Sequence, residues 1–179
     1  RGEYVLYTDE RIDRAFVIKN NPDIIISYNY RYILGDDILD ISRLGIINLH
    51  ISYLPWNRGA NPNIWSFLES TPKGITIHSI DKDIDTGDIL LQKEIFINEN
   101  IETLRTSYER MHREIQDLFK TNWWKLRVGK VVPKKQTSGG TLHYKKDNSL
   151  FESLLKEKGW DTPVNELKNR SNVVNPQYS

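Results

Sequence analysis

Asn48, His50 and Asp85 are the residues of this 179-residue sequence whose types and positions best suit a chemical reaction. An amide can donate a hydrogen bond to an oxyanion, and an imidazole can accept a proton. A carboxylate can orient the imidazole and favour its charged form. Together the three groups could catalyse the attack of an amine on a carbonyl carbon. If the fold brings them together, the sequence indicates an acyl-transfer enzyme.

A structural role is the alternative for each of these residues. A histidine after an apolar strand is more often a hydrogen-bonded structural residue than a catalyst, but Asn48 shares its strand face, and a buried asparagine is costly without partners. Asp85 lies in an Asp-Thr-Gly sequence that is typical of turns. The acids of residues 81–85 also resemble the start of a calcium loop, but Gln92 stands where that loop needs a bidentate glutamate. We therefore expect no metal.

Predicted strands alternate with predicted helices along the chain. The strands are expected at residues 4–7, 23–28, 45–50, 74–80, 88–95 and 141–144, and the helices at 13–20, 36–40, 63–69, 102–128 and 149–157. From about Asn165 the sequence is polar and shows no clear pattern. This alternation predicts an α/β fold with a doubly wound, mainly parallel sheet. Ligands of such sheets bind beyond the carboxyl ends of the strands, where Asn48, His50 and Asp85 are all expected.

Length, charge and composition limit the classes of protein to which this chain can belong. We expect a catalytic domain over residues 1–130 and a hairpin and helix extension of the same domain over 131–179. The net charge of +1 argues against a nucleic-acid partner. No apolar run approaches 18 residues, so no membrane span is expected. The absence of cysteine excludes disulfides and suits a cytoplasmic protein.

The loop at residues 54–62 is the best candidate for binding a substrate. Trp56, Arg58 and Asn61 offer a ring, a guanidinium and an amide, which together suit an anionic or planar ligand. A tight loop before a helix, with Asn61 as the helix cap, is an equally good interpretation. We expect the Trp123-Trp124 pair to be buried or to form a homodimer contact. His78 and His143 have no evident partners in the sequence, and we interpret both as structural.

Several of these segments resemble the formyltransferases that use N10-formyltetrahydrofolate. The resemblance spans roughly Pro22 to Glu94, and the order of its motifs makes it specific. The matching pieces are Ile47-Asn48-Leu49-His50 with Ser52, Leu54-Pro55, Arg58-Gly59 with Pro62, Gly74-Ile75-Thr76-Ile77-His78, and Asp85-Thr86-Gly87-Asp88-Ile89-Leu90 with Gln92.

The resemblance implies a folate-binding cleft at the strand ends of a doubly wound sheet. The catalytic asparagine, histidine and aspartate of the family correspond to Asn48, His50 and Asp85. The pterin-binding positions, which act largely through their backbone, correspond to Arg31, Ile33, Leu34 and Ile84. The strand and glycine-bearing turn that open the family have no match here, so we expect the N-terminal strand to be missing.

Two subgroups of the family fit this chain best. One formylates nucleotide-linked 4-amino-4,6-dideoxy sugars used in surface polysaccharide such as O-antigen, and the other is the formylation domain of peptide synthetases. Both share the patterns at residues 54–59 and 136–143, and we favour the sugar enzyme because no carrier domain follows Ser179. A glycinamide ribonucleotide formyltransferase and a non-catalytic nucleotide-binding module remain alternatives. A methionyl-tRNA formyltransferase is disfavoured by the net charge of +1 and by the absence of a tRNA-holding domain.

Overall fold

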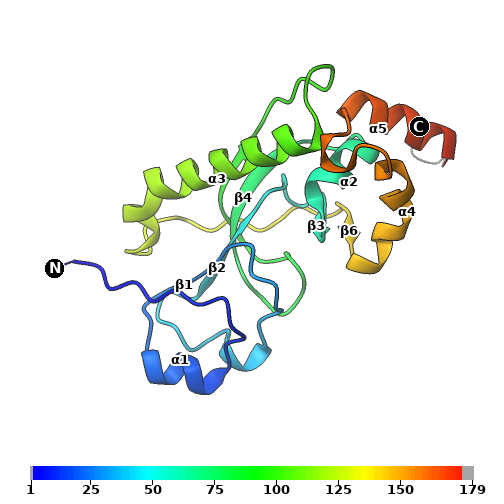
Figure 1. The fold of residues 1–179 in the computed structure, drawn as a ribbon. Helices are drawn as coiled ribbons and strands as arrows, with labels where there is room; N and C mark the ends of the chain where they lie inside the picture. Colours follow the sequence, from blue (N-terminus) through cyan, green and yellow to red (C-terminus); the bar gives the residue numbers. More distant parts are fainter. Residues whose placement is uncertain (1, 175–179) are drawn as a thin grey trace.

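The computed structural model describes residues 2–174, which form a four-stranded sheet with helices around it (Figure 1). The strands lie in the order β1 (Ile25–Ser27), β2 (Ile46–His50), β4 (Gly74–Ser79) and β5 (Ile89–Glu94). β1 runs parallel to β2, but β4 is antiparallel to both of its neighbours. The prediction of an α/β fold is therefore confirmed. The prediction of a mainly parallel sheet is wrong, because the sheet is mixed.

The connections explain the mixed sheet. A parallel neighbour requires a crossover that returns the chain to the starting end of the sheet. Between β4 and β5 the chain has only the loop at residues 80–88, so β5 runs back along β4. After β2 the chain enters α2 (Pro62–Leu68), which packs against α3 (Leu104–Leu126) and α5 (Val164–Val174). β4 therefore starts near the end of the sheet at which β2 finishes, and runs in the opposite direction (Figure 1).

The other elements are short. α1 (Arg14–Asn20) begins after Asp13, whose side chain accepts a hydrogen bond from the Phe16 N–H group. The remaining helical segments are η1 (Asp36–Ile38), η2 (Lys145–Asn148), α4 (Ser149–Glu152), η3 (Ser153–Leu155) and η4 (Gly159–Asp161). Strands β3 (Arg58–Gly59) and β6 (Leu142–His143) form a separate parallel pair. β3 lies in a segment that the sequence predicts to be a loop, because a two-residue strand leaves no periodic pattern.

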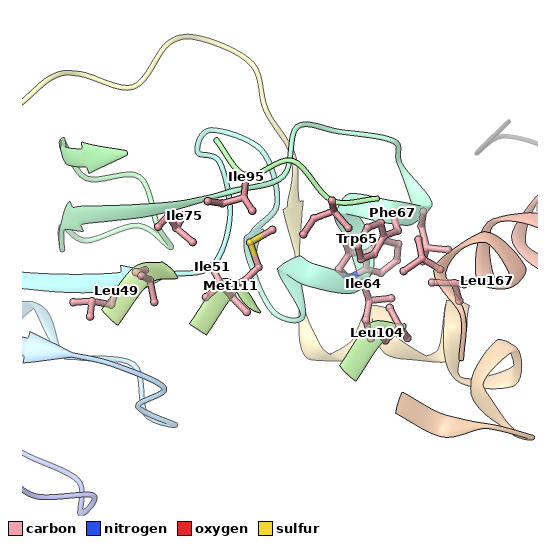
Figure 2. Packing of buried hydrophobic residues seen from close by; sticks show 14 of the residues in the cluster. Leu49, Ile51, Ile64, Trp65, Phe67, Ile75, Ile95, Leu104, Met111 and Leu167 are labelled. Carbon is pink, nitrogen blue, oxygen red and sulfur yellow. The ribbon is translucent and has the colours of Figure 1, made fainter. Parts of the chain in front are cut away.

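Two apolar clusters lie on opposite faces of the sheet. Ile47 and Leu49 of β2 belong to the larger cluster, which also includes Met111 of α3 (Figure 2). Ile46 belongs to the smaller cluster, with Val17 of α1 and Ile38. Because strand residues alternate between faces, Asn48 and His50 share the face of Ile46. The polar residues of β2 therefore lie on the face opposite the larger cluster.

The structure differs from the sequence predictions near both ends of the described chain. The predicted strand at residues 4–7 is wrong: Tyr4, Val5 and Tyr7 are 80–92% exposed and pair with no described strand. The segment around Asn165, which has no clear sequence pattern, is helical: α5 buries Val164 and Leu167 in the larger cluster. Val164 and Leu167 lie one helical turn apart among polar residues, and a pair of apolar residues is too short a pattern to predict a helix. Residues 175–179 lie outside the described part, and the division at residue 130 stays a prediction. Among residues 2–174, every helix is too short or too polar to span a bilayer.

Candidate active site

Asn48, His50 and Asp85 come together on the face of the sheet that also carries Ile46. The His50 Nδ1 atom lies 3.6 Å from Asp85 Oδ2, and the Asn48 Nδ2 atom lies 3.3 Å from Asp85 Oδ1. Both members of the His50–Asp85 pair are largely buried, with side-chain exposures of 9% and 14%. Burial lowers the local dielectric constant and so strengthens interactions among the three groups. The geometry that the sequence motifs predicted is present.

Asn57 fixes the orientation of the His50 ring. The backbone carbonyl of Asn57 lies 3.0 Å from His50 Nε2 and can only accept a hydrogen bond, so Nε2 carries a hydrogen. Asn57 is itself fully buried, with φ of 56°, and its amide donates to Thr71 Oγ1 at 2.7 Å. Nδ1 is therefore the nitrogen that can gain or lose a proton, and it faces Asp85.

Asp85 is held as a carboxylate by its surroundings. Burial alone would raise the pKa of Asp85, but the His50 and His78 imidazoles and the Gly59 N–H group outweigh it. The Gly59 N–H group donates to Oδ2 at 2.8 Å. The pKa of Asp85 consequently lies well below the ordinary value for aspartate. The His50 Nδ1 atom therefore faces a negatively charged carboxylate at 3.6 Å.

His78 is a member of the site that the sequence interpretation missed. Its Nε2 atom lies 3.4 Å from Asp85 Oδ1 and 3.3 Å from Asn48 Nδ2, so the interpretation of a histidine without polar partners is wrong. β2 and β4 are antiparallel, and their register places Asn48 directly opposite His78. Thr76 and His78 alternate with apolar residues in the sequence, which indicates a strand with one polar face. This alternation could have identified His78 as a site residue. His143 also has partners: it stacks on Trp65 and lies 3.1 Å from Glu69.

The predicted substrate residues of the 54–62 loop bond within the protein. The Arg58 guanidinium donates two hydrogen bonds to Gln136 Oε1, at 2.8 and 3.2 Å. The Asn61 amide donates to Asn148 Oδ1 at 2.7 Å, so Asn61 occupies the N-cap position of α2 without capping it through its side chain. Trp56 is partly exposed. Substrate contacts for these three residues stay predictions.

The predicted folate-binding loop has free backbone groups. Within residues 2–174, the N–H and C=O groups of residues 31–34 and of Ile84 make no hydrogen bond with the protein. Leu34 packs on the smaller apolar cluster, and Ile33 is exposed. The Arg31 side chain lies 3.9 Å from Asp9 and over the Tyr32 ring. These segments can accept a flat ligand that carries its own donors and acceptors.

The family model described as Formyl transferase matches residues 8–121, which include Asn48, His50, His78 and Asp85. The chain belongs to the formyltransferase family. A methionyl-tRNA formyltransferase of Caldanaerobacter subterraneus subsp. tengcongensis is 31% identical over 161 residues, which are 87% of this chain and 49% of that protein. The chain thus spans about half the length of such relatives.

Solved formyltransferases share the fold. The formyltransferase PseJ from Anoxybacillus kamchatkensis, in complex with UDP-4,6-dideoxy-4-formamido-L-AltNAc and tetrahydrofolate, is 48% identical, with a TM-score of 0.84. The match covers 92% of this chain and 86% of PseJ. A sugar N-formyltransferase from Shewanella sp. is 26% identical, with a TM-score of 0.72 and coverage of 86% of this chain and 61% of that one.

Proposed function

We propose that this protein transfers a formyl group from N10-formyltetrahydrofolate to the amine of a nucleotide-linked 4-amino-4,6-dideoxy sugar. The observation that carries the proposal is the 48% identity over most of both chains with PseJ, whose bound sugar carries a formamido group at its 4-position. The cluster of Asn48, His50 and Asp85 supplies the groups that such a transfer needs. A cytoplasmic site of action, a homodimer and a role in surface polysaccharide assembly are further parts of the proposal.

Each residue of the cluster has a distinct role in the proposed reaction. The Asn48 amide donates a hydrogen bond to the oxygen of the formyl group as negative charge develops there. His50 Nδ1 accepts the proton lost by the attacking amine, or stabilises the oxyanion when it is protonated. The proton can then pass to N10 of the folate as the bond between N10 and the formyl carbon breaks, which releases tetrahydrofolate. Asp85 stabilises the protonated His50 ring, and the Asn57 carbonyl holds the ring in place.

The folate fits the segment that the resemblance predicted. A pterin ring carries donors and acceptors along one edge, and the free backbone groups of residues 31–34 and Ile84 can pair with them. Leu34 lies on the same face of the sheet as Ile46, and therefore on the face of Asn48 and His50. When it is bound there, the folate supplies the formyl group, and the protein supplies orientation and proton transfer.

A shallow depression of about 480 Å³ lies beyond the carboxyl end of β1, beside α3, and we propose that it binds the nucleotide. Its lining comprises Tyr28, Asn29, Tyr108, Glu109, His112, Arg113 and Gln116. Tyr28 directly follows Ser27, which lies beside Asn48 in the parallel ladder. A depression that combines aromatic rings with amide and guanidinium groups suits a nucleobase and its phosphates.

Hydrogen bonds hold the wall of this depression in shape. Gln116 Nε2 donates to the Tyr28 hydroxyl at 2.9 Å, and that hydroxyl lies 2.6 Å from His112 Nδ1. Burial lowers the pKa of His112, so the ring is neutral near pH 7 and can accept the hydroxyl hydrogen. Tyr108 packs edge-on against His112, and its ring is partly exposed. Tyr108 is thus the ring best placed to stack on a base.

Replacing Tyr108 with alanine should raise KM for the nucleotide sugar about tenfold, since loss of one base-stacking ring typically costs about 1–3 kcal/mol. The kcat value and KM for the folate should change less than twofold. Steady-state kinetics with each substrate varied in turn measures these values. Tyr4→Ala is the matched control, because Tyr4 is 92% exposed. An unchanged KM for the nucleotide sugar in Tyr108→Ala would place the base elsewhere.

The proposed function is tested by a panel of amines. Purified protein is incubated with N10-formyltetrahydrofolate and, separately, a nucleotide-linked 4-amino sugar, the corresponding 3-amino sugar, glycinamide ribonucleotide, an aminoacylated carrier protein and methionyl-tRNA. Tetrahydrofolate release is followed by absorbance, and the formylated product by mass spectrometry. We expect the 4-amino sugar to react with a kcat/KM at least 100-fold above the others. Equal or faster reaction of another amine would overturn the choice of acceptor, and binding of nucleotide without any transfer would favour the binding module.

A further inference from the structure

Gln136 makes four hydrogen bonds at the edge of the active site. Its Nε2 atom donates to the backbone carbonyls of Asp85 and Gly87, each at 2.8 Å. Its Oε1 atom accepts both hydrogen bonds from Arg58, at 2.8 and 3.2 Å. Both amide hydrogens of Gln136 are therefore in use. The Gln136 side chain thus links the loop that carries Asp85 to Arg58 of β3.

The loop around Asp85 needs such support because its conformation is not the intrinsically favoured one. Asp85 has φ of 52°, in the left-handed region that is uncommon for residues other than glycine. Gly87 lies so close to β4 that an added Cβ would be 1.8 Å from the Ser79 carbonyl oxygen. The loop is thus pressed against β4 at Gly87, and Gln136 holds it by its backbone at Asp85 and Gly87.

The segment that carries Gln136 is anchored at both ends. On one side, Lys134 exchanges two backbone hydrogen bonds with Ile89 of β5, at 2.8 and 2.9 Å. On the other side, Thr141 Oγ1 accepts a hydrogen bond from the Asn57 N–H group at 2.9 Å, next to β6. Asn57 is the residue whose carbonyl holds His50. The same segment therefore supports the loops behind both members of the His50–Asp85 pair.

We propose that Gln136 is a positioning residue that sets the distance between the Asp85 carboxylate and the His50 ring. It acts through the backbone of Asp85 and Gly87 and touches neither the amine nor the formyl group. The inference rests on the proposed function, because its kinetic consequence assumes formyl transfer. Without Gln136, the carbonyls of Asp85 and Gly87 lose their donors and the loop can relax away from the left-handed conformation. The carboxylate then moves away from Nδ1.

Gln136→Glu is the most informative substitution. Glutamate has nearly the same shape and keeps an acceptor for Arg58, but it places a negatively charged oxygen against two carbonyls instead of a donor. We expect kcat to fall about 10- to 100-fold, the size of effect that a displacement of about 1 Å can have, while KM for each substrate changes less than threefold. Gln136→Asn, whose amide sits on a shorter arm, should lose less activity. Thr137→Ala, at an exposed neighbouring residue, is the control and should retain wild-type kcat.

A second readout does not depend on turnover. In the wild-type protein, carboxyl ¹³C NMR should show Asp85 ionised at every pH at which the protein stays folded. In Gln136→Glu and Gln136→Asn, its pKa should rise toward the ordinary value, because the carboxylate has moved away from His50. If both variants keep wild-type kcat, or if they lose only thermal stability while Asp85 titrates as in the wild type, the inference is wrong. If the wild-type protein formylates no amine, the proposed function fails, and the NMR titration still decides whether Gln136 positions Asp85.

Discussion

Replacement of Asp85 with asparagine is expected to lower kcat about 10³-fold while the protein remains folded. Asparagine can still accept the hydrogen bond from the Gly59 N–H group, so the loop keeps its position. The change removes the negative charge that faces His50 Nδ1 at 3.6 Å. Serine-protease triads lose about 10⁴ on a change of aspartate to asparagine, partly because the histidine adopts the wrong tautomer. Here the Asn57 carbonyl fixes the tautomer, so we expect the smaller loss that comes from removing the charge. Tetrahydrofolate release under saturating substrates measures the effect.

Asp83→Asn is the matched control for Asp85→Asn. Asp83 lies in the same loop and is exposed, so its neutralisation should leave kcat within a factor of two. If Asp85→Asn also kept near-normal turnover, the carboxylate would have no part in proton transfer, and His50 would act without it. Comparable loss in both variants would instead indicate a general effect of charge in the loop.

The low pKa of Asp85 also sets a dependence of stability on pH. Because the folded-state pKa lies below the value of about 3.9 for unfolded aspartate, the stabilising contribution is present above that value. It is lost as the pH falls through the lower folded-state pKa. The free energy of unfolding of Asp85→Asn should therefore lie below that of the wild type near neutral pH, and the difference should shrink under strongly acidic conditions. Loss of wild-type activity between pH 5 and 7 would have to come from another group.

The shared face of Asn48 and His50 could be predicted from the sequence because it depends on a local rule. Asn48 and His50 alternate with Ile47 and Leu49, so a two-residue period places both polar side chains on one face. The expectation that Asp85 joins them assumed that the strands end at one common edge. Because β4 is antiparallel, its carboxyl end lies beside the start of β2, and the loop at residues 80–88 brings Asp85 back to Asn48 and His50. The larger apolar cluster confirms the alternation, since Ile47 and Leu49 belong to it.

The features that the sequence did not reveal depend on pairing between distant segments. His78 joins the site only because β4 is antiparallel to β2 and sets it opposite Asn48. An alternation of strands and helices gives no information on strand direction when the connecting helix does not cross the sheet. The roles of Gln136 and Thr141 likewise follow from β6 returning to pair with β3, two strands too short for any pattern.

The predicted substrate residues show a further limit of composition. Arg58 and Asn61 have the chemistry of ligand-binding residues, but the structure pairs their side chains with Gln136 and Asn148. A polar side chain in a loop satisfies its hydrogen bonds wherever a partner is available, and sequence position does not identify that partner. The depression lined by Tyr28 and Tyr108 combines two segments about eighty residues apart, so no local sequence motif predicts it.

Replacement of Asn48 with alanine is expected to lower kcat about 10²–10³-fold, the usual loss when one oxyanion donor is removed. The Asn48 Nδ2 atom contacts Asp85 Oδ1 and His78 Nε2 at 3.3 Å each, and in the proposed reaction it exchanges one of these long contacts for the developing oxyanion. Because the donor acts mainly on charge that develops during the reaction, KM for the folate and for the amine should change less than threefold. Asn100→Ala, in an exposed loop, is the control and should be indistinguishable from the wild type. A rise in KM with unchanged kcat would make Asn48 a substrate-binding residue, and the negative charge would then be stabilised by the protonated His50.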